Sequence, residues 1–329
     1  MVVSEMKKEL WLAIEGGGTK TRLLLADTAG TVLARQVGGA SSKLYVQERD
    51  YKAYASRMRV LLGNIKDAAD AVSGRVTVVG LAAPMVPELV TGLVRETLGE
   101  VEFIFSSEGA IALACHDLSW GVSMVAGTGA TCVAVNDQGE GATCGGFGPQ
   151  FGDEGSGYWI GREAIAAAMR EKDGRGPGTV LTQALCAFYK IGHIMEIYKY
   201  RGPGGHVAGP KVASCVPVVF ETARTGDPVA KTVCRRAGHA LGHTVVATVR
   251  RAKLDGQPVP VVFTGGVFNG GPLILTPLKR VLRRSDIEFQ IFPVVTEPGE
   301  GILKVIRKHK EGNGHGVYGQ FLYRRGQCF

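Results

Sequence analysis

Two glycine turns, each set between apolar strands, recur roughly 110 residues apart and constrain the fold more than any other feature. The first is EGGGTKT, between apolar residues 11–14 and 22–26, and the second is GTGAT, between residues 122–126 and 132–135. Each second apolar run ends in a polar turn, DTAG or NDQG. Apolar runs bounded by such turns are typical of strands and hairpins. A unit that recurs with its turn predicts a duplicated domain.

The segments around the two turns alternate between helical and strand patterns, which predicts the α/β fold class. Helices are expected at residues 51–72, 87–98, 109–118, 161–172, 179–189, 227–251, 272–284 and 300–310. Further strands are expected at residues 76–81, 101–105, 259–263 and 287–292. The repeat breaks near residues 118–120, where we place the boundary between two domains.

Glycine and charge are the two unusual features of the composition. The chain has 47 glycines in 329 residues, about twice the usual share, which favours tight turns and close backbone–ligand contacts. The net charge is +8, and residues 304–329 hold six cations and one anion. A solvated basic tail is the simplest interpretation, because a nucleic-acid or membrane patch would lack any recognisable binding motif. We therefore expect neither a nucleic-acid nor a membrane partner.

The cysteines indicate a reducing compartment. There are seven, widely spaced and without a CxxC pair, so neither a disulfide framework nor a zinc site follows. The N-terminus is too charged for a signal peptide, and a cytoplasmic protein is expected. Residues 118–136 carry no charge but contain three glycines, which favours strand–turn–strand over a membrane helix.

A third glycine-rich segment, TGGVFNGG, follows the expected strand at residues 259–263. Backbone N–H groups exposed by glycine can bind phosphate oxygens, and two facing turns could hold a triphosphate from both sides. A single such turn more often only closes a hairpin. None of the three matches a P-loop or a full GxGxxG, so the common nucleotide-binding folds are disfavoured.

Together, EGGGTKT, VAGTGAT, CGGFGPQFGDEGSGYWIGREAI and TGGVFNGG resemble the N-acetylglucosamine kinase family, also called the BadF/BadG/BcrA/BcrD ATPase family. It belongs to the actin–hexokinase–Hsp70 superfamily, and GDEGSGYWIG is its most specific motif here. The resemblance implies two actin-like (ribonuclease H-like) lobes with ATP and Mg²⁺ in the cleft between them. The lobes would be residues 1–118, joined by the helix at about 300–310, and residues 119–299; residues 311–329 form a tail outside the pattern. A homodimer is expected.

The resemblance also implies which residues bind ATP and the metal. Glu15 takes the position of an acid that holds the metal through water, a role suited to a hard oxygen ligand. A charge that merely ends a strand is the alternative for Glu15. The cofactor-binding residues would be Gly16, Gly17, Gly18, Thr19 and Lys20 in the first turn, Gly127, Thr128 and Gly129 in the second, and Gly265 and Gly266 at the adenosine.

Glu108, in FSSEGAIALA, matches the position of the family's general base. A carboxylate there would accept the proton of the sugar hydroxyl as its oxygen attacks the γ-phosphoryl group. The family has Asp at this position, so this carboxylate lies one methylene further from the backbone. The alternative is an acid that only stabilises the N-terminus of a helix.

Asp153, with Gly146 and Phe147 before it, resembles the sugar-contacting segment of the family, although Phe147 could be a core residue.

Two departures from the family pattern affect the acceptor. Lys43 stands where N-acetylglucosamine kinases present an Asn, and Thr131 replaces another sugar-binding Asn. Since Lys only donates hydrogen bonds and is cationic, the acceptor is expected to differ, unless Lys43 is a surface residue.

The resemblance therefore implies an ATP-dependent phosphotransferase acting on a hydroxyl of a sugar or amino sugar. Three alternatives stay open: a kinase of the same fold for another, possibly anionic, acceptor; an ATPase that activates a redox partner, for which Cys132 and Cys144 are the only fairly close cysteine pair; and a non-catalytic sugar sensor. For the kinase, Lys43, Glu108, Thr131 and Asp153 are expected to converge on one pocket.

Overall fold

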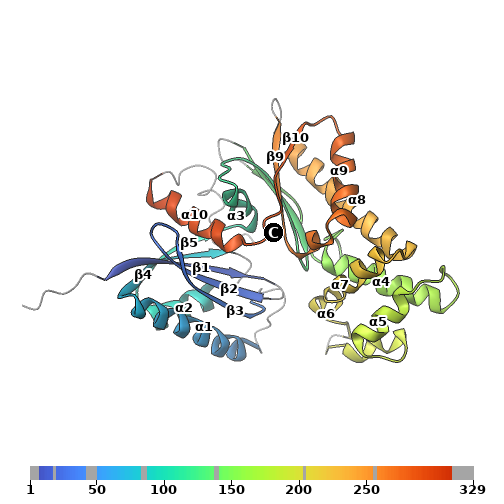
Figure 1. The fold of residues 1–329 in the computed structure, drawn as a ribbon, viewed down its shortest axis with the longest axis horizontal. Coiled ribbons are helices and arrows are strands. Elements are labelled where there is room, and N and C mark those ends of the chain that lie inside the picture. Colours follow the sequence, from blue (N-terminus) through green and yellow to red (C-terminus); the bar gives the residue numbers. More distant parts are fainter. Residues whose placement is uncertain are drawn as a thin grey trace, which may run out of the picture. The chain divides into compact units, whose positions relative to one another are not determined.

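The computed structural model describes residues 7–17, 20–41, 50–82, 87–136, 141–202, 205–254 and 258–312 (Figure 1). The chain divides into two compact units. Unit 1 comprises Met1–Trp120, Val135–Glu140 and Val295–Cys328, and unit 2 comprises Gly121–Ala134, Gly141–Val294 and the last residue. Each unit contains one of the two glycine turns and one five-stranded sheet.

The sheet of unit 1 has the strand order β3-β2-β1-β4-β5. Its strands are β1 (Lys8–Gly16), β2 (Lys20–Asp27), β3 (Val32–Gly39), β4 (Gly74–Ala82) and β5 (Glu102–Ser106). Strand β1 is antiparallel to β2 and parallel to β4, which is in turn parallel to β5. Glu15 pairs with Ala82, and Ala82 pairs with Ser106. The carboxyl ends of β1, β4 and β5 therefore meet at one edge, where Glu15 and the residues after Ser106 lie.

Helices cover both faces of this sheet (Figure 1). They are α1 (Tyr51–Ala71), α2 (Pro87–Leu98), α3 (Glu108–Cys115) and α10 (Pro298–Lys310). Alternate residues of β1, such as Leu12 and Ile14, share a core with Met58 and Leu62 of α1. Helix α10 packs on the opposite face so closely that a Cβ on Gly80 would lie 2.3 Å from Ile302 Cγ2.

Polar contacts fasten α10, which comes from the far end of the chain, to unit 1. Lys304 Nζ donates to the carbonyl of Cys115 at 3.0 Å and pairs with Asp117 at 2.8 Å. At the other end of the helix, Lys310 Nζ lies 2.5 Å from a carboxylate oxygen of Glu102 on β5. The C-terminal helix is therefore an integral part of the unit that holds Glu15 and Glu108.

The sheet of unit 2 has the strand order β10-β9-β6-β7-β8. Its strands are β6 (Gly121–Ala126), β7 (Ala130–Val135), β8 (Gly141–Gly145), β9 (Val259–Thr264) and β10 (Phe289–Ile291). Strand β9 runs parallel to both β6 and β10 and is buried along its whole length. Residues 118–136 therefore form β6, the glycine turn and β7, as the sequence predicts.

Unit 2 also contains the larger set of helices. The α-helices are α4 (Gly157–Lys172), α5 (Leu181–Tyr189), α6 (Gly209–Ala213), α7 (Val216–Arg224), α8 (Pro228–Arg251) and α9 (Pro272–Arg284), and the 3₁₀ helices are η2 (Ile194–Tyr200) and η3 (Gly266–Gly270). Asp227 caps α8 by accepting from Ala230 N at 2.8 Å. No helix in the ranges that the structure describes is long and apolar enough to cross a membrane.

The α/β class predicted from the sequence is confirmed, and the differences lie at the ends of elements and in a few short elements. The helix predicted from residue 179 begins at Leu181, because Asp227 Oδ2 accepts from Thr179 Oγ1 and Val180 N. The helix predicted from residue 161 begins four residues earlier, since Ser156 caps it through Trp159 N. Strand β8 and the helices η2, η3, α6 and α7 were not predicted.

Candidate functional site

Glu15 forms an ion pair on the sheet of unit 1 that the sequence analysis missed. The hairpin register places Arg22 of β2 directly opposite Glu15 of β1. Arg22 Nη1 lies 2.8 Å from Glu15 Oε2, and both side chains are about four-fifths buried, with 18% and 20% of their surface exposed. The guanidinium thus fixes one oxygen of the carboxylate predicted to hold the metal.

The first glycine turn closes the hairpin between β1 and β2. Gly17 N donates to Lys20 O at 2.9 Å, and Gly17 O accepts from Ser41 N at 3.1 Å. Gly16 ends β1, and Lys20 is exposed at the start of β2. A Cβ on Gly17 would meet only Lys20 O, at 3.4 Å, which is ordinary contact. The hairpin therefore does not need glycine there. The predicted Gly18, Thr19 and Lys43 lie outside the described residues.

Glu108 is the first residue of α3, directly after the carboxyl end of β5. Ser107 caps this helix by accepting from Ala110 N at 3.1 Å. Burial and, to a lesser extent, the negative charge of Glu15 raise the pKa of Glu108 to about 8. The N-terminus of a helix would lower this pKa, so burial outweighs the helix dipole. Glu108 is therefore a carboxyl group that can exchange a proton near neutral pH.

The second glycine turn, in unit 2, is attached to a helix. Gly127 N donates to Gly129 O at 2.9 Å within the turn. The carbonyls of Gly127 and Thr128 accept from Gly157 N at 2.8 Å and Tyr158 N at 3.0 Å, at the start of α4. A Cβ on Gly127 would meet nothing within 4 Å. Glycine is therefore not required by the packing at this position either.

Asp153 is a buried aspartate with a left-handed backbone, φ +59°. Burial raises the pKa of its carboxyl group, whereas hydrogen bonds from the backbone N–H groups of Ala130 and Gly148 oppose that rise. A Cβ on Gly129 would lie 2.9 Å from Asp153 Oδ2, so the carboxylate lies against the second turn. Backbone strain at a buried charged residue is a mark of a functional site.

The loop between β8 and α4 brings the other predicted acceptor residues close to this turn. Gly146 N donates to Ala130 O at 2.8 Å, and a Cβ on Gly146 would lie 3.0 Å from Thr131 Oγ1. Phe147 is 67% exposed, so the core-packing interpretation of this residue is wrong. Phe151, which the sequence analysis missed, is 83% exposed on the same loop. Its spacing, four residues after Phe147 in a Gly- and Pro-rich segment, could have suggested it.

Gly265 and Gly266 differ in what the fold requires of them. Gly265 has φ +109°, and a Cβ there would lie 2.3 Å from Ala126 O at the end of β6. Gly265 is therefore needed to bring the ends of β6 and β9 together. A Cβ on Gly266 would meet nothing within 4 Å, so packing does not require glycine at this position.

The structure thus groups the predicted residues within each unit. Unit 1 holds Glu15, Gly16, Gly17, Lys20 and Glu108 around one sheet edge. Unit 2 holds the second turn, Thr131, Gly146, Phe147 and Asp153 together. The convergence of Glu108 with Thr131 and Asp153 stays a prediction, because these residues belong to different units.

The carboxylates of unit 1 suit a magnesium ion that keeps most of its water ligands, rather than a metal ion held entirely by protein side chains. The described residues contain no group of three or more His, Cys, Asp or Glu side chains that could hold a metal. Mg²⁺ usually keeps several waters and takes one or two carboxylates together with substrate phosphates. One carboxylate, Glu15, at the edge beside the first glycine turn fits that pattern.

Two α/β units, each with a glycine turn leading out of its sheet, define the class of fold used by sugar kinases. A ROK family glucokinase from Streptomyces griseus, solved with glucose and AMPPNP, matches with a TM-score of 0.59 at 17% identity, over 91% of this chain and 99% of that one. A Chromobacterium violaceum protein, provisionally assigned as an N-acetylglucosamine kinase, matches with a TM-score of 0.67 at 24% identity, over 90% and 98%. The predicted actin-like fold is confirmed.

The chain belongs to the BadF/BadG/BcrA/BcrD ATPase family, whose sequence profile matches residues 12–293. It is 28% identical over 309 residues to an N-acetyl-D-glucosamine kinase from Dictyostelium discoideum, which covers 90% of this chain and 97% of the relative. It is 26% identical over 302 residues to an N-acetylmuramic acid/N-acetylglucosamine kinase from Clostridium acetobutylicum, with the same coverage. The family predicted from the sequence motifs is confirmed.

Proposed function

We propose that this protein is an ATP-dependent kinase that transfers the γ-phosphoryl group to a hydroxyl of N-acetylglucosamine or a related amino sugar. The observation that carries the proposal is Glu108, a carboxyl group with a pKa of about 8 at the sheet edge that also holds Glu15. Both curated relatives are named as kinases for such sugars. Family membership supports the use of ATP.

The two glycine turns would bind the phosphates of ATP. Gly17 and Gly127 have room for a side chain within the protein, so a ligand that approaches the backbone explains glycine there better than packing does. Mg²⁺, when bound, neutralises negative charge on the phosphate oxygens. Glu15 would hold the ion through water by the carboxylate oxygen that Arg22 does not bind.

Glu108 would accept the proton of the attacking sugar hydroxyl. Only its ionised form can do so, and the rate should therefore rise as pH increases through about 8. Asp153 would accept a hydrogen bond from another sugar hydroxyl, and Thr131 would contact the same face. Phe147 and Phe151, both exposed, would pack on the apolar face of the pyranose ring.

A specific observation supports an anionic acceptor as a second candidate. Lys43 stands at a position where the resemblance implies an Asn, and a lysine suits a carboxylate. N-acetylmuramic acid, one of the two sugars in the name of the Clostridium relative, carries a carboxylate. Comparison of the two sugars as substrates, in wild type and Lys43→Asn, separates these candidates.

The redox-activating ATPase is less well supported. A cluster shared between subunits would need accessible thiolates, whereas Cys132 is fully buried in β7 and burial raises its pKa to about 12. A homodimer remains part of the proposal and can be measured by light scattering.

The test is ADP release over a panel of N-acetylglucosamine, glucosamine, N-acetylmuramic acid and glucose. Wild type should phosphorylate at least one amino sugar, and Glu108→Gln should lose at least about 100-fold in kcat while it still binds ATP. Glu100→Gln, at a strongly exposed site before β5, is the matched control and should behave as wild type. No turnover with any of these sugars, or a wild-type kcat in Glu108→Gln, would overturn the proposal.

A further inference from the structure

The positive charge of the molecule is concentrated on two helices of unit 2. Unit 1 has 19 Lys or Arg and 19 Asp or Glu, whereas unit 2 has 19 and 11 and so accounts for the net charge of +8. Helices α8 and α9 together carry nine cations and no acid. These are Lys231, Arg235, Arg236, Arg250, Arg251, Lys279, Arg280, Arg283 and Arg284.

Helices α8 and α9 pack closely against each other (Figure 1). A Cβ on Gly238 would lie 2.4 Å from Ile274 O, and a Cβ on Gly242 would lie 2.8 Å from Val281 Cβ. Because Gly238 and Gly242 have no side chains, α9 can approach the backbone of α8 directly along this glycine seam. Side chains of α8 and α9 that flank the seam are therefore neighbours.

One face of α8 presents a regular row beside the seam. Lys231, Arg235, His239 and His243 follow one another at four-residue intervals, and positions i and i+4 share a helix face. At about 1.5 Å per residue, this row is roughly 18 Å long. Helices in contact lie about 8–10 Å apart, so α9 adds a second row alongside. The surface is thus extended rather than a pocket for a single anion.

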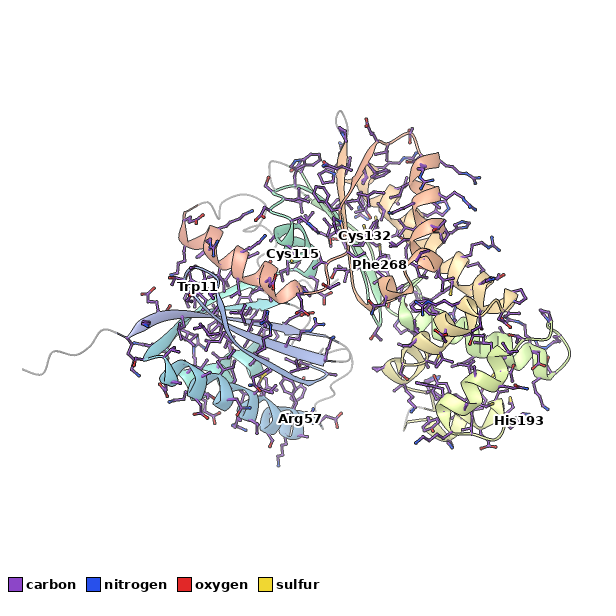
Figure 2. All side chains as sticks on the ribbon, in the orientation of Figure 1. Trp11, Arg57, Cys115, Cys132, His193 and Phe268 are labelled. Atoms are coloured by element: carbon purple, nitrogen blue, oxygen red, sulfur yellow. The ribbon has the colours of Figure 1, made fainter. Side chains whose placement is uncertain are left out.

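The charges on this surface are not compensated. The pKa of His239 is lowered by its partial burial, by Arg235, Arg280 and His243, and by Arg284, so cations of both helices surround it. Of the nine cations, Arg236 pairs with Glu163 at 2.8 Å and Arg250 with Asp286 at 2.6 Å. The other seven form no ion pair within the part of the chain that the structure describes. Figure 2 shows side chains on the outer side of α9 that extend away from the unit, whereas its buried residues face the core.

We propose that the α8–α9 basic surface, defined by Lys231, Arg235, His239, His243, Arg280 and Arg284, binds the phosphate backbone of a nucleic acid without reading its sequence. Its arginines suit phosphate, because the guanidinium group can donate two parallel hydrogen bonds. The large exposed hydrophobic residues all lie outside both helices. Protein and membrane partners usually use such apolar anchors, whereas a polyanion needs none.

This proposal departs from the expectation, based on the sequence, that the protein has no nucleic-acid partner. The count of cations along the chain drew attention to residues 304–329, but the acids of unit 1 balance that excess. The helical row and the glycine seam become visible only in three dimensions. The proposed binding is separate from the kinase activity, since none of these residues belongs to the catalytic machinery.

The test is fluorescence anisotropy with a labelled 20-nucleotide DNA of mixed sequence, single-stranded and duplex, at several salt concentrations. Arg235→Gln/Arg280→Gln/Arg284→Gln removes three charges from the surface. Lys172→Gln/Lys190→Gln/Arg201→Gln removes three from exposed sites elsewhere in unit 2. The first triple variant should bind at least about tenfold more weakly at low salt, with a salt slope shallower by about 2–3, because each phosphate contact contributes roughly 0.7–0.9.

The control triple should lose clearly less affinity, and both variants should keep wild-type kinase activity and thermal stability. Because burial and the neighbouring cations lower the pKa of His239, the affinity of the wild type should also rise as pH falls below about 6.5, where His239 gains a proton among Arg235, Arg280 and Arg284. Absence of binding by the wild type at low salt would overturn the proposal, as would equal losses in the two triples. Tighter binding of polyglutamate or phosphatidylserine vesicles than of DNA would also overturn it and would assign the surface to an acidic protein or a membrane.

Discussion

The two glycine turns share one local plan but lie in different chemical surroundings. In unit 1 the turn is closed by its own hairpin and lies beside the carboxyl groups of Glu15 and Glu108. The negative charge of Glu15 disfavours the ionised form of Glu108. In unit 2 the turn is tied to α4 through Gly157 N and lies against the buried carboxylate of Asp153. The two sheets therefore share a strand–turn–strand plan, with different side chains beside each turn. We infer that unit 1 supplies proton and metal chemistry, and unit 2 holds the acceptor.

The largest effect should come from the titration of Glu108. Its ionised form is the active base, so kcat/KM should rise roughly hundredfold between pH 6 and pH 9 and level off above about 8. Because the pKa is raised in the folded state, the folded protein binds more protons than the unfolded chain between about pH 4.5 and 8, and its stability falls across that range as pH rises. Glu108→Gln should remove both effects.

The measurements are pH profiles of kcat/KM and of the urea midpoint, for wild type and Glu108→Gln. The exposed Glu100→Gln serves as control and should reproduce both wild-type profiles. A wild-type midpoint that is retained in Glu108→Gln would mean that Glu108 is not the titrating base.

Variants of the second turn test whether its glycines are needed for ATP to approach the backbone or for packing within the protein. Gly127→Val meets open space and should keep the melting temperature, yet it should weaken ATP binding at least about tenfold by blocking the backbone N–H groups. Gly129→Val is its counterpart, because its Cβ would displace Asp153 Oδ2 and should lower stability and sugar binding as well. Calorimetric titration of ATP and thermal melts separate the two. Unchanged ATP affinity in folded Gly127→Val would remove this turn from the nucleotide site.

A smaller effect is expected from the exposed aromatic residues of unit 2. Phe147→Ala and Phe151→Ala should each raise the KM for the sugar about fivefold, since an aromatic contact contributes roughly 1 kcal/mol. Neither should change stability, because both rings are mostly exposed. Phe188→Ala, at a partly exposed ring on α5, is the control. An unchanged KM in both variants would show that neither ring touches the acceptor.

Local signals predicted the scaffold well. The α/β class followed from alternating patterns, and the repeated turn marked the strand–turn–strand unit of each sheet. Glu108 was placed at a helix start because FSSEGAIALA resembles the family's base segment, and α3 begins there. These features depend on residues close together in sequence, which is why they could be predicted.

Features that depend on tertiary contacts could not be predicted. The left-handed backbone of Asp153 follows from its position against Gly129, and the exposure of Phe147 follows from the loop that carries it. The partnership of Arg22 with Glu15 required the hairpin register, which a turn of uncertain length does not give. The α8–α9 basic surface needed the packing of two helices separated by a strand.

Arg22 allows the finest test of the contrast between the two turns, and its effect should be the smallest. The guanidinium neutralises part of the charge of Glu15, and that charge raises the pKa of Glu108. Arg22→Met should therefore move the midpoint of the activity profile to higher pH, by less than about one unit, since partly solvated charges interact weakly. Arg35 is an exposed residue of β3 that pairs with Glu300 of α10, and Arg35→Met should leave the midpoint in place. A midpoint that stays fixed or falls in Arg22→Met would show that the charge of Glu15 does not act on Glu108, and the electrostatic distinction between the turns would then be lost.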